Sequence, residues 1–133
     1  MGHLDLDLRF VPGARAPEAA RRGLEALRTA FDDDTVDQAV LLVSELVTNS
    51  VRHAGLRDAD MIAVEVRQDD RSLHIEVSDA GAGFDADVLP RQDGGWGLLL
   101  IDRVADRWGV RRGDRTSVWF EIDAVSGPAD TGT

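Results

Sequence analysis

The chain has 133 residues, of which 43% are hydrophobic, and these values suit one folded domain with a core of its own. It contains no cysteine, which excludes a disulfide framework and a thiolate metal site. No stretch approaches the ~20 apolar residues that span a bilayer, and the first residues lack the apolar run of a signal peptide. We therefore expect a cytoplasmic protein that does not contact a membrane.

The charge of the chain restricts its partners. Its 15 basic and 25 acidic residues give a formal net charge of −10. A field of this sign repels nucleic acid and anionic lipid, so neither is expected as a direct partner. A site for an anionic ligand must therefore work locally, through a cation, backbone N–H groups and a few arginines such as Arg52 and Arg91.

The first 54 residues predict a strand and two helices. Residues 4–10 alternate apolar and charged side chains, which is typical of a strand with one buried face, and Pro12-Gly13 ends it. From about residue 17 to 30 the spacing is helical, with one apolar stripe of Ala20, Leu24, Leu27 and Phe31. Residues 32–34, three aspartates, can cap the next helix.

That next helix, about residues 35–54, is the strongest local prediction. Gly55 marks its C-terminal end. A broad apolar face is expected from Val36, Val40, Leu41, Val43, Leu46 and Val47.

The remaining chain predicts two hairpins separated by a loop and a short helix. Strands are expected at residues 61–67 and 73–78, with a hairpin at Asp69-Asp70, and again at 108–112 and 116–122, divided by Gly113-Asp114. Residues 79–97 lose all periodicity and carry five glycines, so they read as a loop before a helix at 98–107. We expect one domain over residues 1–125, a disordered tail over 126–133, and a two-layer α/β sandwich.

Three polar residues share one stripe of the long helix. Glu45, Asn49 and His53 are spaced four apart, which turns each only about 40° from the last. On this helix alone, a solvated polar face explains them as well as a functional site does. In a cleft, the amide oxygen of Asn49 could ligate Mg²⁺ and the Glu45 carboxylate could accept a proton. His53 is best explained as a partner of the helix dipole.

Two glycine motifs follow. In Asp79-Ala80-Gly81-Ala82-Gly83, directly after a strand, the carboxylate could accept a hydrogen bond from an amine such as adenine's, and the glycines would let the backbone approach a flat ligand. Taken alone, a tight turn explains this motif better. Residues 94–98 precede a helix, whose N-terminal N–H groups can bind an anion, although a linker explains them too. They form neither a P-loop nor a dinucleotide fingerprint.

The order of these motifs is more specific than any one of them. E-x-x-x-N-x-x-x-H on a helix, D-x-G-x-G after a strand, G-x-G-L opening a helix and a threonine in the last strand resemble the GHKL ATPase superfamily. The resemblance covers about residues 41–122. It is greatest to the short anti-sigma-factor serine kinases of bacteria, and residues 95–101 and 105–110 resemble their actinobacterial members. It implies the Bergerat fold, with a mixed, mainly antiparallel sheet covered on one face by helices.

Carried onto this sequence, the resemblance implies a site for ATP and Mg²⁺. Asn49 would coordinate the Mg²⁺ that bridges the phosphates, and Glu45 would be the general base. Asp79 would bind the adenine amine, with Gly81 and Gly83 against the base.

The resemblance also assigns the loop and the last strand. Residues 85–93 would be a short lid, and phosphate would be contacted by Gly95, Trp96, Gly97 and Leu98. Many relatives carry arginine where Trp96 stands. Thr116 would support the adenine-binding aspartate, or Ser117 would do so after a shift of one residue.

Glu45 distinguishes between the subfamilies. In histidine kinases this position is commonly not glutamate, whereas removing the proton of a serine hydroxyl calls for a base. The resemblance therefore implies a serine/threonine protein kinase that sequesters a sigma factor and phosphorylates an anti-anti-sigma protein of the STAS type. A homodimer through the sheet side is a further expectation. Trp96 motivates the alternative of a nucleotide-gated binding module without phosphotransfer, and a purely structural interaction domain is the third interpretation.

Overall fold

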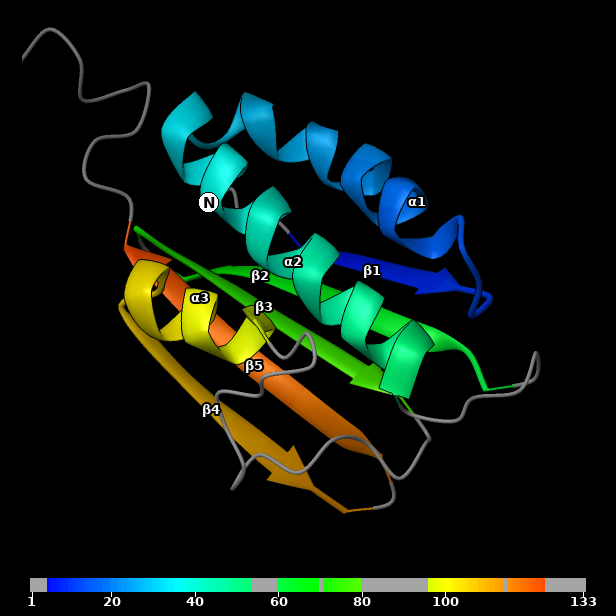
Figure 1. The fold of residues 1–133 in the computed structure, drawn as a ribbon. Helices are drawn as coiled ribbons and strands as arrows, with labels where there is room; N and C mark the ends of the chain where they lie inside the picture. Colours follow the sequence, from blue (N-terminus) through cyan, green and yellow to red (C-terminus); the bar gives the residue numbers. More distant parts are fainter. Residues whose placement is uncertain (1–4, 54–59, 70, 80–95, 114, 124–133) are drawn as a thin grey trace, which may run out of the picture.

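The computed structural model describes residues 5–53, 60–69, 71–79, 96–113 and 115–123. In chain order its elements are β1 (Asp5–Phe10), α1 (Ala16–Gly23), the 3₁₀ helix η1 (Leu24–Thr29), α2 (Asp33–His53), β2 (Ile62–Asp69), β3 (Ser72–Asp79), α3 (Trp96–Val104), β4 (Arg107–Arg112) and β5 (Thr116–Asp123). The helices lie together on one face of the sheet (Figure 1). The expected two-layer sandwich is confirmed.

The five strands form one sheet in the order β1-β2-β3-β5-β4. The expectation of a mixed sheet needs one correction, because every strand pairing in the described residues is antiparallel. Two hairpins, β2–β3 and β4–β5, account for half of these pairings. Since β5 enters the sheet between β3 and β4, the N-terminal end of β5 lies beside the C-terminal end of β3.

Helix α2 begins where the aspartate turn predicts. The backbone N–H of Thr35 donates to Asp32 Oδ2 at 3.3 Å, and the Thr35 hydroxyl donates to Asp32 Oδ1 at 2.6 Å. Asp32 is thus the N-terminal cap of α2 and satisfies a backbone donor that has no partner inside the helix. These hydrogen bonds, chiefly the one from the Thr35 hydroxyl, hold the pKa of Asp32 below its usual value.

The buried face of α2 differs in one position from the prediction. Leu41 is exposed, with 43% of its surface accessible, whereas its neighbour Leu42 is fully buried. A helix turns about 100° per residue, so Val36, Ala39 and Leu42 share the buried face of α2 and Leu41 turns away from it. The stripe predicted for the preceding helical segment is confirmed, since all its members are buried: Ala20, Leu24, Leu27 and Phe31.

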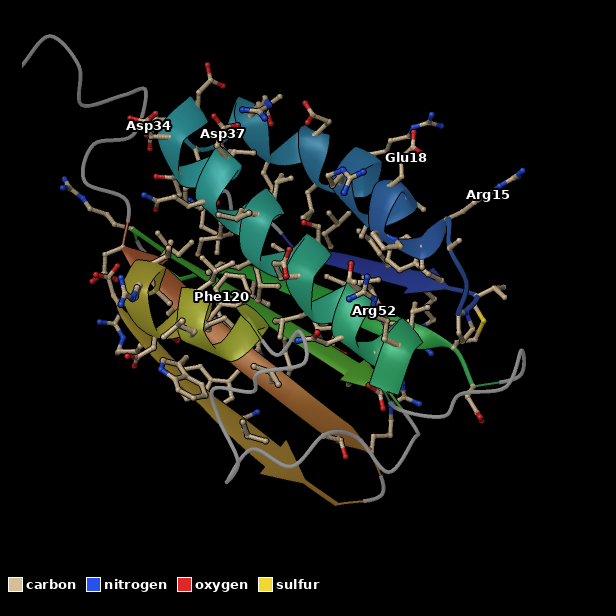
Figure 2. The ribbon with its side chains drawn as sticks, viewed as in Figure 1. Arg15, Glu18, Asp34, Asp37, Arg52 and Phe120 are labelled. Atoms are coloured by element: carbon tan, nitrogen blue, oxygen red, sulfur yellow. The ribbon has the colours of Figure 1, made fainter. Side chains whose placement is uncertain are left out.

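The core lies between the helices and the sheet. Alternate residues of each central strand point toward the helices, as the period of two requires. The sheet contributes nine buried apolar side chains to the core cluster: Ile62, Val64, Val66, Leu73, Ile75, Val77, Val118, Phe120 and Ile122. Figure 2 shows Phe120 on this helix-covered side. No helix in the described part of the chain is long and apolar enough to cross a membrane.

The opposite face of the sheet carries a polar layer around one indole. The rings of His74 and Trp119 are stacked, with 5.7 Å between their centroids. The Arg111 guanidinium lies over the same indole at 5.7 Å and also donates to Glu76 at 3.2 Å. These side chains belong to β3, β4 and β5, so the layer joins the strands that lead to the candidate site.

Candidate functional site

Helix α2 and strands β3 and β5 meet at a small indentation. Each element contributes one apolar and one polar side chain to its lining: Leu46 and Ser50 from α2, Val77 and Asp79 from β3, and Thr116 and Val118 from β5. The three polar side chains are all buried, and only 2% of the surface of Asp79 is accessible to solvent. A carboxylate in such a position accepts hydrogen bonds in a largely desolvated place, where they are strong.

The sheet register determines which hydroxyl faces Asp79. Asp79 is the last residue of β3, and its partner across the sheet is Thr116, the first residue of β5. Ser117 pairs with Ser78 and points to the other face, where its hydroxyl donates to Glu76 Oε2 at 2.6 Å. Of the two assignments left open by the sequence, the structure therefore places Thr116, and not Ser117, beside the aspartate.

Glu45 and Asn49 lie on consecutive turns of α2, as their spacing predicts. Asn49 is buried, with 6% of its surface exposed, and Glu45 is half-buried. Ser50, the neighbour of Asn49, contacts Asp79, so the polar stripe adjoins the indentation. Arg52 projects from the last turns of α2 and is exposed (Figure 2). His53 is the last residue of the helix, and its side chain lies outside the described residues.

The glycine motifs are only partly described. Gly81, Gly83 and Gly95, and the expected lid over residues 85–93, lie outside the described residues. Helix α3 begins at Trp96 and includes Gly97 and Leu98, so it starts two residues earlier than predicted and ends at Val104. The side chains of Trp96 and Leu98 are not among those described.

Sequence reasoning missed two residues at this site. The Ser50 hydroxyl donates to Asp79 Oδ2 at 2.7 Å, and Ser50 is itself buried. Its signal was a hydroxyl that continues the apolar stripe of Val43 and Leu46, where a polar group needs a partner. The Arg115 guanidinium donates to the carbonyl oxygens of Met61 at 2.9 Å and Ser78 at 3.2 Å. It thereby joins the start of β5 to the residue before Asp79.

Two side-chain oxygen donors lie on consecutive turns of α2. No group of three or more histidine, aspartate or glutamate side chains among the described residues could hold a metal by itself. Mg²⁺ is commonly bound through one or two protein oxygens together with substrate phosphates. The Asn49 amide oxygen, with the Glu45 carboxylate one turn away, fits such a shared site.

With this geometry in place, comparison with known proteins identifies the family. The family described as "Histidine kinase-like ATPase domain" matches residues 12–122. The chain belongs to this family. The matched range includes α2, β3 and β5, so the indentation and its polar side chains lie within the ATPase domain.

Individual relatives agree with the family. The serine-protein kinase RsbW of Listeria innocua is 32% identical, and the match covers 61% of this chain and 61% of that kinase. The sensor histidine kinase YdfH of Bacillus subtilis is also 32% identical, over 56% of this chain and 18% of that protein. The chain thus spans about three-fifths of the RsbW kinase.

Solved structures show the same fold. The crystal structure of the RsbU and RsbW domains of a Mycobacterium tuberculosis protein superposes with a TM-score of 0.73 at 20% identity, covering 91% of this chain and 32% of that one. A blue-light activated histidine kinase of Erythrobacter litoralis gives a TM-score of 0.57 at 26% identity, over 68% of this chain and 31% of that one. The histidine kinase-like ATPase fold is therefore found independently of the sequence match.

Proposed function

We propose that this chain binds ATP between α2, β3 and β5 and transfers its γ-phosphoryl group to a serine or threonine of a small anti-anti-sigma protein, and that it sequesters a sigma factor. The observation that carries the proposal is the meeting of Asp79, Ser50 and Thr116 in one indentation beside Glu45 and Asn49. Membership of the ATPase family and the likeness to a serine-protein kinase support it.

The proposed binding step uses Asp79 as an acceptor. Its carboxylate would accept a hydrogen bond from the exocyclic amine of adenine, at the end of β3 where the chain leaves the sheet. Burial makes this bond selective. A ligand without the amine would shield the carboxylate from water and offer no hydrogen bond in exchange, which costs binding free energy. Thr116, in register with Asp79, would support the same carboxylate from β5.

The proposed transfer step uses Glu45 as the base. The hydroxyl oxygen of the substrate attacks the γ-phosphorus, the bond from that phosphorus to the β–γ bridging oxygen breaks, and ADP leaves. The hydroxyl proton passes to the Glu45 carboxylate. The Asn49 amide oxygen would hold Mg²⁺, which when bound neutralises phosphate charge that a chain of net charge −10 would otherwise repel.

An ATP titration by calorimetry, with and without Mg²⁺, tests the binding step. The chain should bind ATP more tightly with Mg²⁺, and Asp79→Asn should lose at least tenfold in affinity, because the amide places a donor where the amine also donates. Asp5→Asn, an exposed change on β1, is the matched control and should bind as the parent does. Equal ATP affinity in the parent and in Asp79→Asn would contradict the proposed adenine site.

A second experiment separates the kinase from a nucleotide-gated binding module. Incubation with labelled ATP and a candidate anti-anti-sigma protein should yield phosphoserine or phosphothreonine on that protein. The alternative is motivated by Trp96, which opens α3 and brings no positive charge to the expected phosphate loop. The binding module would be favoured if the chain bound ATP tightly, and its affinity for a partner depended on the nucleotide, but no phosphoryl group was transferred to that partner.

A further inference from the structure

Ser50 stands apart from the other hydroxyl residues in the middle of α2. Ser44 donates to the Leu41 carbonyl oxygen at 3.1 Å and Thr48 to that of Ser44 at 2.7 Å, so both bond back to their own helix. This is what helical hydroxyls ordinarily do. The Ser50 hydroxyl instead crosses to the sheet and donates to Asp79 Oδ2 at 2.7 Å.

The bond between Ser50 and Asp79 is short and buried. At 2.7 Å between the two oxygens it is a well-formed O–H···O hydrogen bond, and both residues are at least 97% buried. Ser50 is placed by a helix whose adjacent turn is held in the core by Leu46 and Val47. The hydroxyl is therefore a fixed point against which the carboxylate can be oriented.

A fixed point matters because the terminal torsion of an aspartate is otherwise loose. That torsion is broad and roughly two-fold, so packing alone does not set the plane of the carboxylate. The Ser50 hydroxyl, which donates to Oδ2, restricts this torsion. A carboxylate offers about four acceptor positions, so the bond from Ser50 is compatible with a further donor from a ligand.

We infer that Ser50 is a positioning residue: it orients the Asp79 carboxylate so that the site selects a purine with an exocyclic amine. This inference rests on the proposed ATP function and deepens it. Without the hydroxyl, the carboxylate loses the donor on Oδ2 that helps to orient it, and the bond to the amine weakens. A purine without the amine makes no such bond, so its affinity does not depend on Ser50.

The test is a double-mutant cycle in which one change removes the Ser50 hydroxyl and the other removes the 6-amino group of the ligand. Ser50→Ala and the parent are titrated with ATP and with purine riboside 5′-triphosphate, which is ATP without the 6-amino group. Ser50→Ala should lose about tenfold in affinity for ATP and little for purine riboside triphosphate, so that the two ligands bind nearly equally. Ser50→Thr keeps the donor and should keep the preference for ATP. Ser44→Ala, which removes a hydroxyl that bonds its own helix, is the control and should leave both affinities unchanged.

The outcomes separate the two proposals. An equal loss for both nucleotides in Ser50→Ala, or no loss for either, overturns the positioning role while the ATP site stands. Failure of the parent chain to prefer ATP over purine riboside triphosphate overturns the adenine site and the role of Ser50 together. Because both ligands are compared on the same protein, a general loss of stability in Ser50→Ala does not imitate the expected result.

Discussion

Gly109 of β4 lies directly against the indole of Trp119 on β5, its partner in the sheet register. A Cβ added at Gly109 would come within 2.7 Å of Trp119 Nε1 and 2.9 Å of Cε2. The missing side chain therefore lets the indole lie close against β4. The same ring stacks on His74 and lies under the Arg111 guanidinium, so Gly109 adjoins the polar layer of the sheet.

Replacing this glycine should destabilise the fold. Gly109→Ala forces the Trp119 indole out of place, and we expect the free energy of unfolding to fall by about 1–3 kcal/mol, as for other overpacked sites. Urea unfolding followed by circular dichroism measures it. In Gly113→Ala, the control in the same hairpin, a Cβ would meet nothing within 4 Å. A similar effect of both substitutions would mean that the indole contact is not the cause.

Acid should weaken the far end of the same hairpin. Arg107 donates to Glu121 Oε1 at 2.7 Å and to Asp123 Oδ1 at 2.5 Å, and these bonds are the main reason why the pKa values of both carboxyls lie below their usual 4.5 and 3.8. A lowered pKa in the folded state contributes stability above the unfolded value. This contribution should therefore be lost as the pH falls below about 4.5 and through the folded pKa values.

The Arg107 interaction can be isolated by substitution. Arg107→Gln should make the free energy of unfolding less dependent on pH between 5 and 3, since both carboxyls then titrate nearer to their unfolded values. Urea midpoints measured across this range provide the comparison. The control is Arg22→Gln, which removes an exposed pair with Glu18 on α1 and should leave the pH profile as steep as in the parent. Parallel profiles for Arg107→Gln and the parent would contradict the assignment.

The N-terminal cap of α2 should contribute measurably to the free energy of unfolding. Asp32→Ala removes both hydrogen bonds with Thr35 and should lower the free energy of unfolding by about 1 kcal/mol. Asp32→Asn retains an acceptor oxygen and should recover most of this loss. Thermal unfolding of the three proteins measures it. If Asp32→Ala and Asp32→Asn were equally destabilised, the charge rather than the cap geometry would be responsible.

The two residues of the polar stripe should separate binding from transfer. Asn49→Ala should remove the increase in ATP affinity that Mg²⁺ gives, because it deletes the proposed ligand oxygen. Glu45→Gln should leave ATP affinity nearly unchanged and lower the rate of phosphotransfer by about 10²-fold or more. Calorimetry and a transfer assay on the same preparations check both expectations. Phosphotransfer at the parental rate in Glu45→Gln would exclude Glu45 as the base.

Much of the fold could be predicted from the sequence because its signals are local. The alternating residues of β1 and the apolar stripe from Ala20 to Phe31 follow directly from the periods of strand and helix. The face of α2 was predicted less accurately, since a run of apolar residues does not reveal which one turns outward. The apolar spacing predicts Leu41 in the core, whereas the structure exposes Leu41 and buries its neighbour Leu42.

The site was less accessible to sequence reasoning because it depends on pairings between distant segments. The choice between Thr116 and Ser117 could not be made from spacing, since a shift of one residue in register moves a side chain to the other face of the sheet. The bond between Ser50 and Asp79 joins residues 29 positions apart. The two residues become neighbours only because α2 packs over β3 in the folded chain.

The place of β5 in the sheet has a consequence for synthesis of the chain. Strand β4 is synthesised before β5, but in the sheet β5 lies between β3 and β4. The edge of β3 that faces β5 therefore stays unpaired until β5 has been synthesised. Thr116 and Val118, which close the indentation opposite Asp79, are on that strand. A nascent chain on the ribosome therefore cannot complete this indentation until residues up to about Asp123 have emerged, and binding at the proposed nucleotide site would report that the whole sheet has folded.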